Sequence, residues 1–330
     1  TVASRMAKLT GLAIIAGAVV AAGLFPAAAV GIAATGVIHN EWENQPNSVP
    51  APSLPGRTKL LTVDGKKVAE VFSTNRVPVS ADQQGPWIRK AVVAVEDARF
   101  YSHSGVDPIG TMRALVATGG GDSVQGGSTI TQQYAKNLRL TQAAIEAGGE
   151  ATAETRDALT ERSWKRKVAE AHLATVIEKS TSKEDILTGY LNVGYFGSGA
   201  YGIQAAARRY YSTDATKLTL SQAATLAGVL QSPVSLDPRL KPERTLVRRA
   251  QVLNAMAAKG MVTAAEAAQA QAEPITLALS LPEQGCQVAG RDWGMVCDGA
   301  LRELKAADWL GPEATNLLRA GGLTVQLSVD

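Results

Sequence analysis

The longest apolar run of the chain lies in its first 40 residues. No Asp, Glu, Lys or Arg occurs between Lys8 and Glu41, and most of the intervening residues are Ala, Val, Gly, Leu and Ile. About 20 such residues span a bilayer. Arg5 and Lys8 precede the run and Glu41 and Glu43 follow it, so we expect residues 1–40 to form a cytoplasmic tail and one transmembrane helix.

A cleaved signal peptide is the alternative interpretation, with Ala27–Ala29 as the cleavage site. The apolar run is much longer than the 7–15 residues usual for the core of a signal peptide, which favours the anchor. The remainder of the chain is then expected to lie outside the cytoplasmic membrane.

The pattern changes after residue 40. Residues 41–58 are rich in Pro, Ser and Asn and predict an extended connector. Apolar segments on either side of Asp64-Gly65 predict a β-hairpin within a connector that covers 41–84. From Trp87 onward the apolar residues recur at helical spacing. The helices are expected at 162–179, 183–192, 200–210, 221–230 and 243–259, besides the one that begins at Trp87.

Composition agrees with a mainly α fold, since Ala is abundant and aromatic residues make up only 5% of 330 residues. Lys and Arg exceed Asp and Glu by three, so nothing in the net charge indicates a nucleic-acid partner. In an oxidising compartment, Cys286 and Cys297 are expected to close a short disulfide loop, with two free thiols as the alternative. Two cysteines alone do not supply a four-ligand zinc site.

Adjacent carboxylates, Glu96 and Asp97, end the helix that begins near Trp87. A carboxylate at the edge of an apolar face can have a raised pKa and act as a general acid or base. Acidic residues at helix ends are more often solvated or capping groups, and His103, which follows, is more often structural than catalytic.

Two further segments offer groups for an anionic ligand. A Gly pair before Ser128 and Thr129 predicts a helix start, whose free amides can receive a phosphate. Four cations, Arg162, Lys165, Arg166 and Lys167, fall within six residues and repel one another unless an anion is present. An exposed ion-pair face with Glu170 is the alternative reading of this cluster, but it leaves most of the positive charge unexplained.

A third segment is better explained as the start of a helix than as a catalytic motif. Thr181 and Glu184 have the spacing of a capping box before the next helix. Ser180 and Lys183 match a Ser-x-x-Lys pattern, but no Lys-Thr-Gly or Ser-x-Asn partner follows, so we interpret that match as accidental.

Five ordered segments together resemble a known family. VEDARFYSHSGVDPIG, GGSTITQQYAKNL, ERSWKRKVAEA, KEDILTGYLNVGYFGSGAYGIQAAARRYY and LAGVLQSPVSLDP are similar to the motifs of the peptidoglycan glycosyltransferases of class A penicillin-binding proteins. The resemblance implies a lysozyme-like helical fold for residues 85–275, lipid II and the growing glycan strand as substrates, and a site beside the membrane. Cell-wall synthesis proteins are further expected partners.

The resemblance also implies roles for single residues. Glu96 matches the general base, and Glu170 matches a second glutamate that organises the donor phosphates or a bound divalent cation, Mg²⁺ or Mn²⁺. No organic cofactor is implied. The expected substrate contacts are Asp97, Ser128, Thr129, Gln132, Gln133, Lys136, Asn137, Arg162, Arg166 and Lys167.

The end of the chain, GGLTVQLSVD, resembles the strand that opens the transpeptidase half of bifunctional members. We therefore expect residues 276–330 to be a linker and the start of a transpeptidase half that lies beyond this chain. A lytic lysozyme-like enzyme and a non-catalytic membrane scaffold are the alternative functions. The first has no use for a cationic diphosphate site, and the second would tolerate loss of Glu96.

Overall fold

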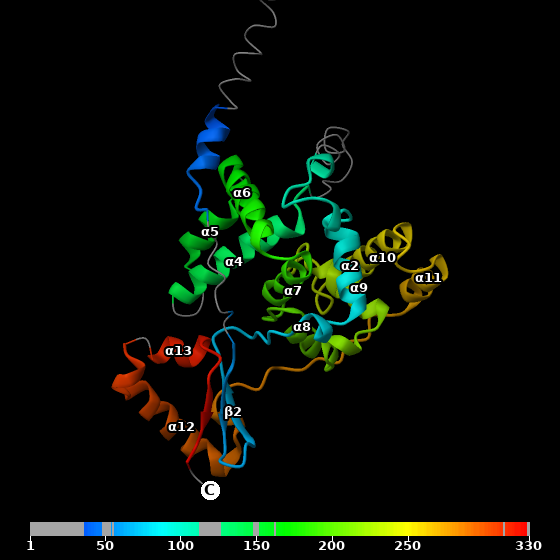
Figure 1. The fold of residues 1–330 in the computed structure, drawn as a ribbon. Helices are drawn as coiled ribbons and strands as arrows, with labels where there is room; N and C mark the ends of the chain where they lie inside the picture. Colours follow the sequence, from blue (N-terminus) through cyan, green and yellow to red (C-terminus); the bar gives the residue numbers. More distant parts are fainter. Residues whose placement is uncertain are drawn as a thin grey trace, which may run out of the picture.

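Helices make up most of the computed structural model, which describes residues 36–47, 54, 56–111, 127–147, 152–161, 163–312 and 314–328 (Figure 1). In chain order the elements are β1 (Thr58–Leu61), β2 (Lys67–Val71), η1 (Ala81–Gln83), α2 (Pro86–Glu96), η2 (Phe100–Ser102), α4 (Ile130–Glu146), α5 (Ala153–Thr160), α6 (Trp164–Ser180), α7 (Lys183–Val193), α8 (Ile203–Tyr211), η3 (Ala215–Lys217), α9 (Leu220–Val229), α10 (Pro242–Ala258), α11 (Ala264–Ala272), η4 (Cys286–Val288), α12 (Gly290–Ala306), η5 (Asp308–Leu310), α13 (Ala314–Ala320) and β3 (Thr324–Gln326). The predicted mainly α class is confirmed, and each predicted helix corresponds to one of α2 and α6–α10.

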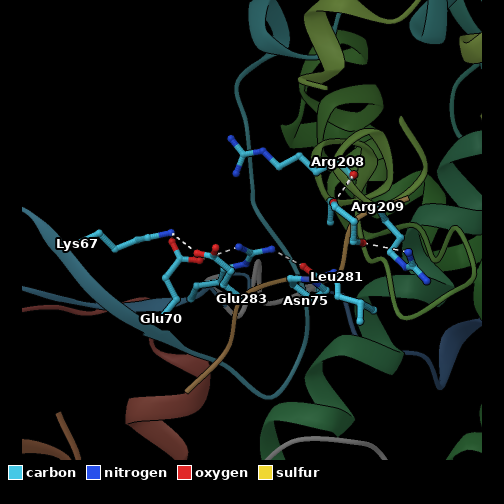
Figure 2. A pocket seen from close by; sticks show the side chains of 11 residues that line it. Lys67, Glu70, Asn75, Arg208, Arg209, Leu281 and Glu283 are labelled. Atoms are coloured by element: carbon cyan, nitrogen blue, oxygen red, sulfur yellow. Dashed lines mark hydrogen bonds and ion pairs between the residues drawn. The ribbon is translucent and has the colours of Figure 1, made fainter. Parts of the chain in front are cut away.

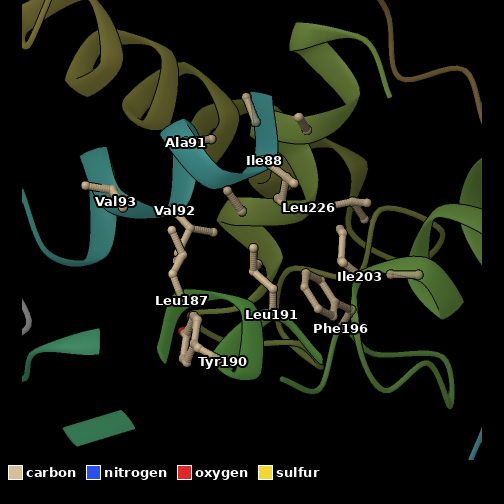
Figure 3. Packing of buried hydrophobic residues seen from close by; sticks show 14 of the residues in the cluster. Ile88, Ala91, Val92, Val93, Leu187, Tyr190, Leu191, Phe196, Ile203 and Leu226 are labelled. Atoms are coloured by element: carbon tan, nitrogen blue, oxygen red, sulfur yellow. The ribbon is translucent and has the colours of Figure 1, made fainter. Parts of the chain in front are cut away.

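The main hydrophobic core lies where α2, α7 and α9 meet. On the apolar face of α2, Val92 lies beside Leu187 of α7 and Ile88 lies beside Leu226 of α9, all within one buried cluster (Figure 3). Helix α9 is buried along most of its length, and its Ala and Gly residues let α2 and α10 approach closely. Because the apolar face of α2 is fixed in this core, the position of Glu96 at its end is fixed as well.

A smaller unit is built on the predicted hairpin. Strands β1 and β2 pair antiparallel, with Gly65 at a φ of +80° in the turn, and β3 adds to β1 in parallel, giving the strand order β2-β1-β3. Leu60 and Leu327 pack with Cys286 and Cys297, which form a disulfide with Cα atoms 5.4 Å apart. The disulfide prediction is confirmed. Strands from the predicted connector and from the segment after 276 therefore share one sheet.

One predicted helix cap is wrong by a single residue. Helix α7 begins after Ser182, whose side chain accepts a hydrogen bond from the Asp185 backbone N–H. Glu184, expected to close a capping box with Thr181, instead pairs with Arg89 of α2. The Ser182 hydroxyl caps the helix in place of the Thr181 hydroxyl, one residue later than predicted. The start of the helix was therefore predicted correctly, although its capping residue was not.

The predicted transmembrane helix falls almost entirely on residues 1–35, outside the described residues. In the part of the chain that is described, no helix has both the length and the apolar character needed to cross a bilayer. Residues 36–43 are helical, and the Trp42 ring packs edge-on against His172 of α6 at 4.9 Å between centroids.

A candidate active site where α2, α4, α6 and α10 meet

Glu96 occupies the last position of α2 and faces into the protein. Its side chain is 11% exposed. Oε2 accepts a hydrogen bond of 2.8 Å from Gln133 Nε2 on α4, while Oε1 is buried and finds no hydrogen-bond partner among the described residues. Arg248 Nη2 of α10 lies 3.6 Å from Oε1. One carboxylate oxygen is thus held in place while the other is left without a donor.

Burial raises the pKa of Glu96, because an ionised carboxylate loses its hydration there. The hydrogen bond from Gln133 and the charges of Arg248 and Lys136 act in the opposite direction, and Asp97 adds to the rise. A carboxylate with a raised pKa and one oxygen that accepts no hydrogen bond from the described residues is suited to accept a proton. These properties agree with the role of a base, which stays a prediction for Glu96.

Asp97 lies beside Glu96 in sequence but has a structural position. Its carboxylate is buried, receives the backbone N–H of Ile130 at 3.0 Å and lies 2.9 Å from His103 Nε2. These bonds tie the end of α2 to the start of α4. Asp97 was predicted to contact substrate, but its placement does not support that role, because successive residues at a helix end point in different directions. The structural reading of His103 is confirmed.

The start of α4 is also occupied by protein groups. Thr129 caps the helix and forms a capping box with Gln132, and both side chains are buried. Asp97 also accepts a hydrogen bond from Ile130 N–H, so the polar groups at the start of α4 find their hydrogen-bond partners within the protein. The predicted helix start is confirmed, whereas the predicted substrate contacts of Thr129 and Gln132 are not supported by this arrangement.

Cationic side chains gather around Glu170 on α6. Its two oxygens are paired with Arg166 and with Lys167 Nζ, the latter at 2.9 Å, and Lys167 Nζ also donates to Ser128 Oγ at 2.7 Å. Glu170 is itself buried. Ser128, Arg166, Lys167 and Glu170 thus form one contact network, and their predicted roles towards the substrate stay predictions.

Lys136 of α4 connects this cluster to the base. Burial lowers its pKa, with the charges of Lys167 and Arg166 acting in the same direction and those of Glu170 and Glu96 opposing them. Within the described part of the chain, its ammonium makes no hydrogen bond or ion pair. Asn137, the next residue, is half-buried. The predicted Arg162 lies outside the described residues.

Two residues of the site had not been predicted, namely Arg248 and Tyr190. Arg248 approaches the free oxygen of Glu96, and Tyr190 on α7 donates its hydroxyl to Gln133 Oε1 at 2.9 Å. Tyr190 falls within a family-like segment, but its spacing indicates an ordinary core position. Arg248 belongs to an amphipathic helix with no motif, so no local signal identifies it.

A divalent cation does not fit the residues as they stand. Both oxygens of Glu170, the predicted metal residue, are engaged by cationic side chains. The described residues contain no group of three or more His, Cys, Asp or Glu side chains placed to hold a metal ion. Divalent cations prefer several oxygen ligands, and a carboxylate already paired with Arg and Lys is a poor one.

Comparisons with known proteins identify a shared family. A family model described as Transglycosylase matches residues 64–257, more than half of the chain. Penicillin-binding protein 1F of Bacillus subtilis is 37% identical over 70% of this chain and 30% of its own length. Penicillin-binding protein 1A of Escherichia coli is 37% identical over 68% of this chain and 24% of its own length. The chain thus spans less than a third of these relatives.

Among solved structures, penicillin-binding protein 1A from Haemophilus influenzae aligns with 83% of this chain and 27% of its own length. The aligned residues are 20% identical and the TM-score is 0.40, a value too low to support an argument about a shared fold.

Proposed function

The chain belongs to the transglycosylase family, and from that premise we propose that it is a peptidoglycan glycosyltransferase that polymerises lipid II into β-1,4 glycan strands. The observation that carries this proposal is Glu96, a largely buried carboxylate with one oxygen held by Gln133 and the other without a hydrogen bond from any described residue. The lysozyme-like character of the fold and the inversion at the anomeric carbon are parts of the same proposal.

In the proposed reaction Glu96 takes the proton from the 4-hydroxyl of the acceptor GlcNAc. The oxygen attacks the anomeric carbon of the donor MurNAc, and the bond from that carbon to the diphosphate breaks. Undecaprenyl diphosphate leaves with the bonding electron pair, and the proton remains on Glu96 until solvent removes it. General-base catalysis of this kind contributes about 10²- to 10⁴-fold.

The leaving group requires positive charge, which the cluster next to Glu96 supplies. Lys136, Arg166 and Lys167 carry three positive charges and Glu170 one negative charge, a surplus of two. A diphosphate diester carries two negative charges. Fixed cations aimed at a developing anion lower the barrier, because they need no reorganisation during the reaction. A lytic enzyme, whose leaving group is a sugar hydroxyl, has no need of this surplus.

No step of this mechanism is assigned to a divalent cation, since Glu170 is already paired on both oxygens. Addition of a chelator is therefore expected to leave the affinity of the protein for inorganic diphosphate unchanged. A loss of diphosphate affinity on chelation would restore the metal prediction for Glu170.

The proposed setting is the outer face of the cytoplasmic membrane. The helix at 36–43 packs through Trp42 on His172 of α6, the same helix that carries Arg166 and Lys167 (Figure 1). If the residues before 36 are anchored in a bilayer, α6 and its cations lie close to it. A lipid-linked donor would then reach the cluster without leaving the membrane. The growing strand, the membrane and other cell-wall proteins remain proposed partners.

The decisive experiment is polymerisation of labelled lipid II by the detergent-solubilised chain. Wild type is expected to form glycan that lysozyme digests, and Glu96→Gln is expected to form none. Glu70→Gln removes a similarly buried carboxylate outside the site, so it serves as the matched control and should polymerise. Polymer formation by Glu96→Gln at the wild-type rate would rule out this base.

A further inference from the structure

We propose that Tyr190 is a positioning residue that fixes the side-chain amide of Gln133 with its NH₂ group towards Glu96. This inference rests on the proposed function, in which Glu96 must be ionised before it accepts a proton. Tyr190 itself touches neither the carboxylate nor, in this proposal, the substrate.

Three residues form a chain of hydrogen bonds that crosses three helices. The Tyr190 hydroxyl donates to Gln133 Oε1 at 2.9 Å, and Gln133 Nε2 donates to Glu96 Oε2 at 2.8 Å. Tyr190 is 1% exposed, and its ring packs beside Leu187 and Leu191 (Figure 3). Because the ring is packed in the core, the position of the Tyr190 hydroxyl is fixed. The hydroxyl can therefore fix the orientation of the Gln133 amide.

The two ends of an amide have opposite hydrogen-bonding roles. If the Gln133 amide turned over, its oxygen would face the Glu96 carboxylate, and that contact is favourable only when Glu96 is protonated. The amide NH₂ would then point at the Tyr190 oxygen, and the hydroxyl hydrogen would need another acceptor. Among the described residues no other partner of this hydroxyl is found, and leaving a buried donor unpaired is costly.

Tyr190 therefore couples the orientation of Gln133 to the ionisation of Glu96. With the hydroxyl present, the NH₂ group faces the carboxylate and favours its charged form. Without the hydroxyl, the amide is free to present its oxygen and favour the protonated form. The charged groups facing Glu96 from other elements are Arg248 of α10 and Lys136 of α4, with Asp97 following it in the chain. Among the described residues, the hydrogen-bond donor to the amide oxygen is Tyr190.

The test is Tyr190→Phe, which keeps the ring and removes only the hydroxyl. The acidic limb of the pH profile of kcat/KM should move to higher pH by about one unit, the size expected from one buried hydrogen bond. Tyr210→Phe is the matched control. Tyr210 is equally buried and its hydroxyl donates to the Phe196 carbonyl at 3.0 Å, away from Glu96, so its pH profile should stay at the wild-type position.

A second measurement keeps the inference independent of activity. Carboxyl ¹³C NMR of glutamate-labelled protein reports the titration of Glu96 directly, with its resonance assigned by its loss in Glu96→Gln. Tyr190→Phe should raise the pKa of Glu96 and Tyr210→Phe should leave it unchanged. On a Gln133→Met background the effect of Tyr190→Phe should disappear, because the amide that transmits it is gone.

The outcomes separate the two proposals. If wild type makes no glycan but Tyr190→Phe still shifts the Glu96 resonance, the enzymatic proposal fails and the positioning role stands. If the Glu96 titration is the same in wild type and Tyr190→Phe, or if Tyr210→Phe moves it equally, the positioning role is overturned. If Tyr190→Phe folds poorly, 3-fluorotyrosine can be placed at position 190 instead. Its hydroxyl is a stronger donor, so the titration of Glu96 must shift to lower pH.

Discussion

Two regions of this molecule are built from the same charged residue types but use them differently. One is the candidate site around Glu96. The other is a cavity of about 250 Å³ between the small sheet and the helical body, lined by Arg57, Lys67, Glu70 and Glu283 among others (Figure 2). In the cavity Arg57 pairs with Glu70 at 2.7 Å and Lys67 with Glu283 at 3.2 Å. In the site, one oxygen of Glu96 receives no hydrogen bond from the part of the chain that the structure describes.

The difference separates charges that support the fold from charges that remain available for chemistry. Arg57 also bonds to Asn75 and lies over the Phe72 ring, so it joins parts of the smaller unit to one another. Because these charged groups are already paired with one another, few of their hydrogen bonds and ion pairs remain to be made by a ligand. A buried carboxylate without its full set of donors is costly to maintain, and such groups concentrate where chemistry occurs.

After loss of the base itself, the largest expected effect comes from removing a cation in the site. Lys136→Met should lower polymerisation of labelled lipid II by about 100-fold, because one fixed charge facing the leaving group is lost. Lys66→Met is the control, since among the described residues Lys66 pairs only with exposed Asp64. If Lys136→Met were as active as wild type, the leaving group would not lie beside Lys136.

The next effect is on stability and falls in the cavity. Glu70→Gln leaves Arg57 without its carboxylate partner in a place where both side chains are about nine-tenths buried. The free energy of unfolding should fall by about 2 kcal/mol, below the range for a completely buried pair. Denaturant titration measures this change. If Glu70→Gln also abolished polymerisation in folded protein, the two regions would not be functionally separate.

A third prediction concerns pH. Burial raises the pKa of Glu96, so as pH falls the proposed base should be lost at a higher pH than an ordinary glutamate, with rate declining about tenfold per unit. Between its unfolded and folded pKa values, the folded state binds more protons at Glu96 than the unfolded state does. The contribution of Glu96 to stability must therefore grow as pH falls through that window. As pH falls, activity should therefore decrease while the contribution of Glu96 to stability increases. Rate measurements and denaturant titrations of wild type and Glu96→Gln can compare the two.

The smallest effect is expected at the edge of the cavity. Lys67 and Glu283 are about half and two-thirds exposed. Exposed pairs of this kind contribute little, so Lys67→Met should change the free energy of unfolding by less than about 0.5 kcal/mol. A larger loss would mean that the cavity depends on this pair as much as on Arg57 and Glu70.

The sequence predicts the helices better than the direction of individual side chains. Apolar spacing identified α2, and the family-like motifs brought Glu96, Gln133 and Lys136 together correctly. The same motifs placed Asp97 and Thr129 with the substrate, although Asp97 joins the end of α2 to the start of α4 and Thr129 donates its hydroxyl to the Gly105 carbonyl. Which way a residue points at a helix end depends on tertiary packing, and periodicity within the helix carries no information about it.

Of the two residues that sequence analysis missed, Arg248 lies outside the family-like motifs and Tyr190 lies within one. Arg248 reaches Glu96 because α10 packs against α2, a contact that no local pattern in α10 indicates. The role of Tyr190 depends on one hydroxyl, and apolar periodicity treats tyrosine as a core residue. The fold class and most of the site were therefore predictable, while the groups that adjust the base required the three-dimensional structure.

The parallel pairing of β3 with β1 also has a consequence for the order in which the chain folds during synthesis. The hairpin β1–β2 emerges from the ribosome early, but Thr58 meets its partner Leu323 only 265 residues later. A two-stranded hairpin is marginally stable by itself. The whole helical body can therefore be made and folded while β1 still has an open edge, and the small sheet is completed after it.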